Sequence, residues 1–185
     1  MKRFIFAFLA GLLLLTQLQP TAVARQDDAR LTELFSRLQQ TGDEQEARLI
    51  EGLIWRLWFE SGSPDTDRLI QAGNDAMGAG RFEEALNRFS RVIEVDPSFA
   101  EGWNRRATLY YLMGNYEASV RDIQETLLRE PRHFGALSGL GLINSTLERW
   151  ESAMKAYEEA LRVNPHLPGA KKNVEDIKKK MEQDI

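Results

Sequence analysis

The side chains that could carry out chemistry are few in this sequence and are not grouped into a motif. There are two histidines, His133 and His166, and neither is followed three or four residues later by another metal ligand. Asp122 and Glu125 share one face of a predicted helix, where paired carboxylates are usually solvated. The glycines in 78–80 do not follow a predicted strand, as a phosphate-binding loop would require. We therefore expect neither an enzyme nor a bound cofactor or metal ion.

The absence of cysteine and the net charge further narrow the possible functions and partners of this protein. A chain without cysteine has no disulfide, no thiolate nucleophile and no zinc–thiolate site, so packing must hold its fold together. The formal net charge of −4 argues against nucleic acid as a partner, because domains that bind nucleic acid carry an excess of Lys and Arg.

The first 24 residues differ in kind from the rest of the chain. Lys2 and Arg3 precede an apolar run over 4–15, and the tripeptide Ala-Val-Ala occupies 22–24. This pattern predicts a secretory signal peptide over 1–24, with export to the periplasm. The apolar run is shorter than the roughly 20 residues that a spanning helix needs. The alternative is an uncleaved segment that anchors the protein to the membrane.

A period of 34 residues organises the middle of the chain. It relates Pro97, Pro131 and Pro165; Phe82, Tyr116 and Trp150; Leu69, Trp103 and Leu137; and Ala85, Ser119 and Ala153. Apolar residues recur at helical spacing within each unit, and the helical pattern ends before each proline. Such a period indicates stacked helical hairpins, none of which can bury its apolar face alone.

This spaced set of large, small and aromatic positions, ended by a proline, resembles the tetratricopeptide repeat (TPR) family. The resemblance covers residues 66–99, 100–133 and 134–167 and implies an all-α fold, an α-solenoid of three TPR helix hairpins. Small residues such as Gly73 and Gly141 are expected to let the two helices of a unit approach closely. Four positions depart from the family pattern: Arg106 replaces a leucine, Thr126 an alanine, Asn144 a tyrosine and Glu148 the turn glycine.

The segments that flank the repeats are also predicted to be helical. Residues 25–65 lack the TPR pattern, so we expect an N-terminal helical hairpin that caps the array. Its second helix is apolar on two sides, which predicts packing between the hairpin's first helix and the first repeat. Alternatively, Trp55 and Phe59 form an exposed anchor for a partner. Residues 168–185 predict a C-terminal capping helix whose lysines are solvated or, alternatively, meet anionic lipid.

The resemblance also implies a concave groove, lined by the first helix of each unit, that binds a partner segment. The candidate groove residues in this chain are Asn74, Met77, Asn104, Thr108, Tyr111, Ser138 and Leu142. Tyr111 is the expected anchor, because tyrosine is enriched at binding hot spots, whereas the adjacent Tyr110 is expected in the core. One TPR subgroup grips a peptide's terminal carboxylate with a set of polar residues, of which only Asn74 matches. A chaperone tail is therefore not the expected ligand.

Two glycines in the first helix of the third unit have no packing reason in the repeat pattern. Gly135 and Gly139 each cost up to about 1 kcal/mol relative to alanine in a helix interior. They indicate either a ligand that approaches the backbone closely or a loosely held helix.

The sequence as a whole predicts a protein–protein interaction adaptor or scaffold that acts within an envelope complex. A partner segment would bind in the concave TPR groove. The alternative is a membrane-tethered assembly subunit that is held by an uncleaved N-terminal helix.

Overall fold

A computed structural model describes residues 28–183, and within that range the chain is built from helices without a strand. The predicted signal peptide lies outside the described residues. The helices are α1 (Ala29–Gln40), α2 (Glu44–Phe59), α3 (Pro64–Gly78), α4 (Phe82–Val95), α5 (Ala100–Leu112), α6 (Tyr116–Arg129), α7 (Phe134–Thr146), α8 (Trp150–Val163) and α9 (Pro168–Gln183).

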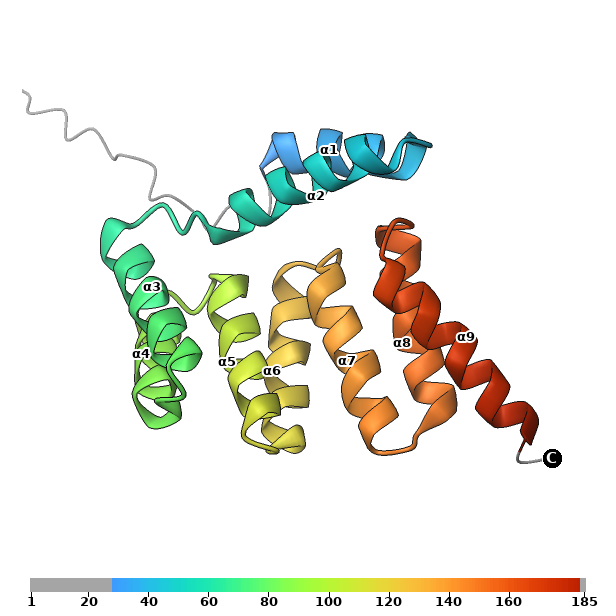
Figure 1. Cartoon of the computed structure of the whole chain (residues 1–185). Helices are drawn as coiled ribbons and strands as arrows, with labels where there is room; N and C mark the ends of the chain where they lie inside the picture. Colours follow the sequence, from blue (N-terminus) through green and yellow to red (C-terminus); the bar gives the residue numbers. More distant parts are fainter. Residues whose placement is uncertain (1–27, 184–185) are drawn as a thin grey trace, which may run out of the picture.

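Three antiparallel hairpins, α3–α4, α5–α6 and α7–α8, stack side by side, and α9 continues the stack at its C-terminal end (Figure 1). Each of these helices packs against the next along the chain. This arrangement confirms the predicted α-solenoid. No helix within 28–183 is both long enough and apolar enough to cross a bilayer.

The turn inside each hairpin ends the first helix with a residue in the left-handed region. Gly80 and Gly114 take this conformation in the first two repeats, at φ 71° and 74°. Glycine suits the position because it lacks the Cβ that crowds the following carbonyl group. In the third repeat Glu148 adopts φ 54°, so the turn keeps its shape although the usual glycine is missing.

The small residues allow close helix approach, as predicted. A Cβ atom on Gly73 would overlap the ring of Phe89, and one on Gly141 would lie 2.7 Å from the ring of Tyr157. In the second repeat the Ser119 hydroxyl donates a hydrogen bond of 2.7 Å to the carbonyl oxygen of Ala107. Each repeat therefore brings its two helices together at a small residue, which is a glycine in the first and third repeats and Ser119 in the second.

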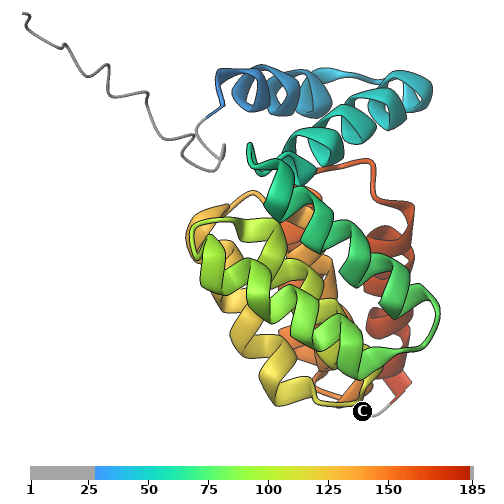
Figure 2. The same ribbon diagram turned by 90° about the vertical axis from the view of Figure 1, so that its left-hand side faces the viewer.

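The N-terminal hairpin lies across one end of the repeat helices, as both views show (Figures 1 and 2). Its apolar side forms one cluster with the third repeat: Leu31, Phe35 and Leu38 of α1, Ile50, Ile54 and Trp58 of α2, Phe134 of α7 and Val163 of α8. Of the hairpin residues that the structure describes, Phe59 at the end of α2 alone packs against the apolar cluster of the first repeat.

This placement corrects both expectations for the hairpin. The second helix α2 is not held between α1 and the first repeat, because the third repeat supplies most of its buried neighbours. Trp55 and Phe59 are not an exposed anchor either. The Trp55 ring lies 5.4 Å from that of Phe134, and the guanidinium of Arg105 lies 4.4 Å above the ring of Phe59.

The C-terminal helix α9 covers the apolar face of the last hairpin. Ala170, Val174 and Ile177 are buried against Ala153 and Tyr157 of α8. The lysines of α9 lie on its exposed side, where Lys172 pairs with Asp176 at 2.5 Å. The solvated-face interpretation of this lysine-rich helix agrees with these contacts.

Candidate partner-binding groove

Two hollows lie next to each other on the repeat array and share residues of α7. The first has a volume of about 100 Å³ and lies between α5, α6 and α7. The second, of about 290 Å³, lies between α7 and α9. Gly139 and Leu142 line both hollows, so these two residues form the ridge between them.

Five of the seven candidate groove residues line these hollows. Asn104, Thr108 and Tyr111 come from α5 and line the first hollow, Ser138 lines the second, and Leu142 lines both. The second hollow also receives Asn173 and Ala170 from α9, which sequence reasoning did not place in the groove. The sequence feature that could have indicated these two residues is the predicted helix over 168–185, which continues the stack after the third repeat.

Asn74 and Met77 of α3 are not among the residues that line the two hollows. Met77 packs against the apolar cluster of the first repeat. The side-chain oxygen of Asn74 is buried and accepts no hydrogen bond from any residue in 28–183. The structure thus gathers the candidate residues of α5 and α7 and leaves those of α3 apart.

Tyr111 and Tyr110 differ less in burial than the sequence suggested. Tyr111 lines the first hollow and its ring lies 5.7 Å from that of Tyr116. Tyr110 is half-buried and outside the core clusters, with the guanidinium of Arg106 5.8 Å from its ring. The prediction for Tyr110 as a core residue is therefore wrong.

The amide of Asn104 is held by a buried carboxylate one turn earlier on α5. Its Nδ2 donates a hydrogen bond of 3.0 Å to Glu101, whose side chain is almost fully buried. Arg105 also donates to Glu101, at 2.6 Å. Asn104 therefore reaches the groove with its orientation fixed by Glu101, rather than as a freely rotating surface side chain.

Glu101 also receives a hydrogen bond from His133, across the junction of two repeats. The Nε2 atom of His133 lies 3.0 Å from the Glu101 carboxylate, and the backbone N–H of Ala136 donates to Nδ1 at 3.0 Å. Because Nδ1 accepts, Nε2 must carry the proton and donate to Glu101. His133 thus caps the start of α7 and is bonded to α5 with the same ring.

The N-terminal hairpin covers this histidine. The Trp58 ring stacks on His133 at a centroid distance of 4.2 Å and an angle of 9°. The indole N–H of Trp58 donates to buried Glu130 at 3.4 Å, and Arg132 pairs with Glu130 at 3.0 Å. These contacts join α2 to the junction of α6 and α7. Sequence reasoning missed them because the two sides are more than 70 residues apart.

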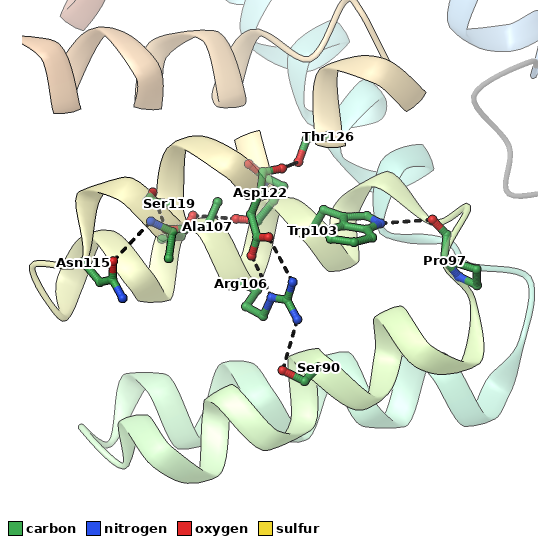
Figure 3. A network of polar contacts seen from close by, with 12 residues as sticks. Ser90, Pro97, Trp103, Arg106, Ala107, Asn115, Ser119, Asp122 and Thr126 are labelled. Atoms are coloured by element: carbon green, nitrogen blue, oxygen red, sulfur yellow. Dashed lines mark hydrogen bonds and ion pairs between the residues drawn. The ribbon is translucent and has the colours of Figure 1, made fainter. Parts of the chain in front are cut away.

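A second polar contact ties the first two repeats together (Figure 3). Arg106 donates to both carboxylate oxygens of Asp122, at 2.7 and 2.9 Å, and to the Ser90 hydroxyl at 3.2 Å. The hydrogen bonds to Asp122 raise the pKa of the Arg106 guanidinium above its ordinary value. Asp122 is 4% exposed, so the expectation that it is a solvated surface carboxylate is wrong.

Trp103 lies beside this ion pair and is only partly buried. Its indole N–H donates to the carbonyl oxygen of Pro97 at 3.0 Å, as Figure 3 shows. The guanidinium groups of Arg106 and Arg129 lie 5.2 and 4.7 Å from its ring. Trp103 is thus held at the surface by a hydrogen bond and two cation–π contacts.

The two glycines of α7 have different roles in the structure. A Cβ atom on Gly135 would lie 2.6 Å from the Trp55 ring, so the N-terminal hairpin requires a glycine there. A Cβ atom on Gly139 would meet only Ile123, at an ordinary 3.6 Å. Gly135 is therefore needed for packing against Trp55, a contact with the N-terminal hairpin that the repeat pattern does not predict. Gly139 instead leaves the helix backbone open to the groove.

Alanine at these two glycines is expected to change stability in opposite directions. Gly139→Ala should raise the free energy of unfolding by up to about 1 kcal/mol, because alanine favours the helix and fits the available space. Gly135→Ala should lower it by about 1–3 kcal/mol, because the methyl group displaces the Trp55 ring. Urea denaturation followed by circular dichroism measures both. Equal stabilisation by the two variants would show that Trp55 is not seated against α7.

The described residues contain no group of three or more His, Cys, Asp and Glu side chains that could hold a metal ion. The buried acids Glu101, Asp122 and Glu130 each pair with a basic side chain. Their contacts position helices and do not converge on either hollow. None of these three acids is among the residues that line the two hollows.

A sequence model of the tetratricopeptide repeat matches residues 70–119 and 105–168 of this chain. The chain is 39% identical to a TPR repeat-containing protein of Rhizobium etli over 152 residues, which cover 82% of this chain and 74% of the relative. It is 27% identical over 152 residues to small glutamine-rich tetratricopeptide repeat-containing protein 2 of Saccharomyces cerevisiae. That match covers 81% of this chain but 44% of the yeast protein, so the chain spans less than half of it.

Solved TPR domains share this fold. The Sgt2 TPR domain from Aspergillus fumigatus superposes with a TM-score of 0.61 at 24% identity, over 65% of this chain and 82% of that domain. The first TPR domain of Spaghetti (RPAP3), solved with the HSP90 peptide SRMEEVD, gives 0.61 at 21% identity, over 63% of this chain and 93% of that domain. At these identities the likeness concerns the fold.

Proposed function

The chain belongs to the tetratricopeptide repeat family, and from this membership and its groove we propose that it is a protein-interaction adaptor. It binds an extended segment of a partner protein along α5, α7 and α9. The observation that carries this proposal is the pair of adjoining hollows, lined by five of the residues that the family pattern places in the groove.

The lining of the hollows favours a partner segment with apolar and uncharged side chains. Neither hollow is lined by a charged residue. The HSP90 peptide in the RPAP3 structure carries three acidic residues. Because the two hollows offer no cation to such acids, we propose a neutral segment that places an apolar side chain on each side of Leu142. Asn104, Ser138 and Asn173 are polar groups that can bond its backbone.

The uncovered helix backbone at Gly139 supports a partner segment that crosses α7. With no side chain between the two hollows at this point, a partner segment can pass close to α7. A larger residue there would separate the hollows. The segment would therefore run across α7 from the first hollow to the second.

Leu142→Glu is expected to weaken binding of such a segment at least thirtyfold. Groove peptides of this kind bind near micromolar, or about −8 kcal/mol, and loss of one anchor costs about 2 kcal/mol. Leu142 is exposed, so a charge there should change stability little. The measurement selects neutral peptides from a displayed library on the wild-type protein and determines their affinity by calorimetry.

Leu112→Glu is the matched control, because Leu112 is an exposed leucine of α5 that is not among the lining residues. This variant should bind the selected peptides as tightly as the wild type. If Leu142→Glu binds them equally well, the groove is not the binding site.

We further propose that the adaptor acts in the periplasm, within an envelope complex, after removal of residues 1–24. The charged start, the apolar run and the Ala-Val-Ala tripeptide support this proposal. The mature protein is expected to begin at Arg25, and N-terminal sequencing of the protein from a periplasmic extract measures this. Recovery only in membranes with Met1 retained would favour the membrane-tethered alternative.

A further inference from the structure

Three leucines of the N-terminal hairpin form an apolar face that turns away from the repeats. Leu49 and Leu53 of α2 are 65% and 42% exposed, and half-buried Leu34 of α1 lines a groove together with Leu53. Trp58, which packs on the repeats, follows Leu49 by nine residues, or two and a half helical turns. The two residues are therefore on opposite sides of α2. We call Leu34, Leu49, Gly52 and Leu53 the outer hairpin face.

A groove of about 380 Å³ runs between α1 and α2 on this face. Leu34, Leu53 and Leu57 line it, together with charged side chains of both signs: Arg30, Glu33, Arg56 and Glu60. At the other end of the hairpin Arg37 pairs with Glu46 at 2.8 Å. The apolar centre is thus bordered at each end by a base and an acid.

Gly52 is an independent sign of a helix partner on this face. It lies in the interior of α2 on the same stripe as Leu49, Leu53 and Arg56, and a Cβ atom on it would have no neighbour within 4 Å. Glycine is a poor helix former, and no packing contact in 28–183 requires it here. A glycine between two exposed leucines lets a second helix approach closely.

We propose that the outer hairpin face binds the same face of a second copy of this chain, related by a two-fold axis near Gly52 and Leu53. A two-fold contact needs a self-complementary surface, because each copy offers the other the same patch. The ends of this face meet that need, since they carry acids and bases in similar number. Anionic lipid would be attracted by Arg30, Arg37 and Arg56 but repelled by Glu33, Glu46 and Glu60, so this face has no net charge that favours a membrane surface.

Helix geometry supports this pairing. With α2 antiparallel to its copy about Gly52 and Leu53, position 56 stands opposite position 49 of the second copy, and position 48 opposite position 57. Arg56 then lies one turn from Glu46 of the second copy, and Arg48 one turn from its Glu60. Arg48 also comes near Arg56 of the second copy, but it already pairs with Glu44 of its own helix at 3.6 Å. Two sets of opposite charges are repeated on the other side of the axis, and the leucines meet at the centre.

The mass of the purified full chain in solution tests the proposal. We expect the wild type to be a dimer by light scattering and sedimentation at micromolar concentration. Leu53→Glu should weaken the dimer at least about tenfold. The control is Leu128→Glu, because Leu128 is 75% exposed on α6, outside the outer hairpin face, and its replacement should leave the dimer intact. A monomeric wild type at hundreds of micromolar, or a dimer that Leu53→Glu leaves unchanged, would overturn the proposal.

Cross-linking tests the position of the axis. Because the chain has no native cysteine, an introduced cysteine can form a disulfide only with the same residue of a second copy. Equivalent residues meet at a two-fold axis, so Gly52→Cys should form a disulfide-linked dimer under mild oxidation. Leu128→Cys should not. Equal cross-linking of both variants, or none at Gly52→Cys, contradicts the pairing. Binding of a monomeric wild type to phosphatidylglycerol vesicles, lost in Leu53→Glu, would assign the face to a membrane surface and overturn the proposal.

Discussion

Trp58→Ala is expected to lower the free energy of unfolding by about 3–5 kcal/mol, the usual cost of truncating a buried tryptophan. The Trp58 side chain is buried, stacks on His133 at 4.2 Å and lies 4.9 Å from the ring of Phe134. Its loss leaves Glu130 without the indole hydrogen bond. Because Trp58 joins α2 to the repeats, we also expect amide hydrogen exchange to quicken first in α1 and α2.

Trp103→Ala is the matched control, because it makes the same substitution at a partly exposed site. It removes a hydrogen bond to Pro97 and two cation–π contacts but leaves no large cavity in a core. Its cost should be clearly smaller, about 1–2 kcal/mol. Urea denaturation of both variants makes the comparison. Equal losses would mean that Trp58 contributes no more to stability than a partly exposed tryptophan, and would contradict its role in joining α2 to the repeats.

Asp122→Ala is expected to lower the free energy of unfolding by about 3 kcal/mol, because it leaves the guanidinium of Arg106 without its carboxylate. Removing one partner of a buried ion pair typically costs about 3–5 kcal/mol. The Arg106 side chain retains 18% exposure, so water relieves part of that cost. Thermal and urea unfolding of the variant measure the loss.

The double variant Arg106→Leu with Asp122→Ala provides the decisive comparison. Leucine is the residue that the TPR pattern has at position 106, and replacing both members of a buried pair by apolar side chains is often neutral. We expect the double variant to recover most of the stability that Asp122→Ala loses. If the double variant is as unstable as Asp122→Ala, the cost does not come from an uncompensated charge on Arg106.

Local signals in the sequence determined the helices and the stacking of the repeats. The 34-residue period, the prolines and the small residues act between neighbours along the chain, so no distant contact is needed to interpret them. Gly73 and Gly141 meet the rings of Phe89 and Tyr157 within their own hairpins. The residues of α5 and α7 that line the two hollows were predictable for the same reason, because the family pattern fixes which side of each first helix is concave.

Tertiary structure alone decided where the N-terminal hairpin packs and which polar groups are buried. Helix α2 is apolar on two sides, and its sequence does not distinguish the first repeat from the third as the surface that it covers. That choice depends on shape, because Gly135 leaves room for the Trp55 ring and His133 offers a flat face to Trp58. Asp122 became a buried acid in the same way, since its partner Arg106 lies on another helix of the stack. Periodicity reports the face of one helix, whereas burial and charge pairing depend on the second helix that meets it.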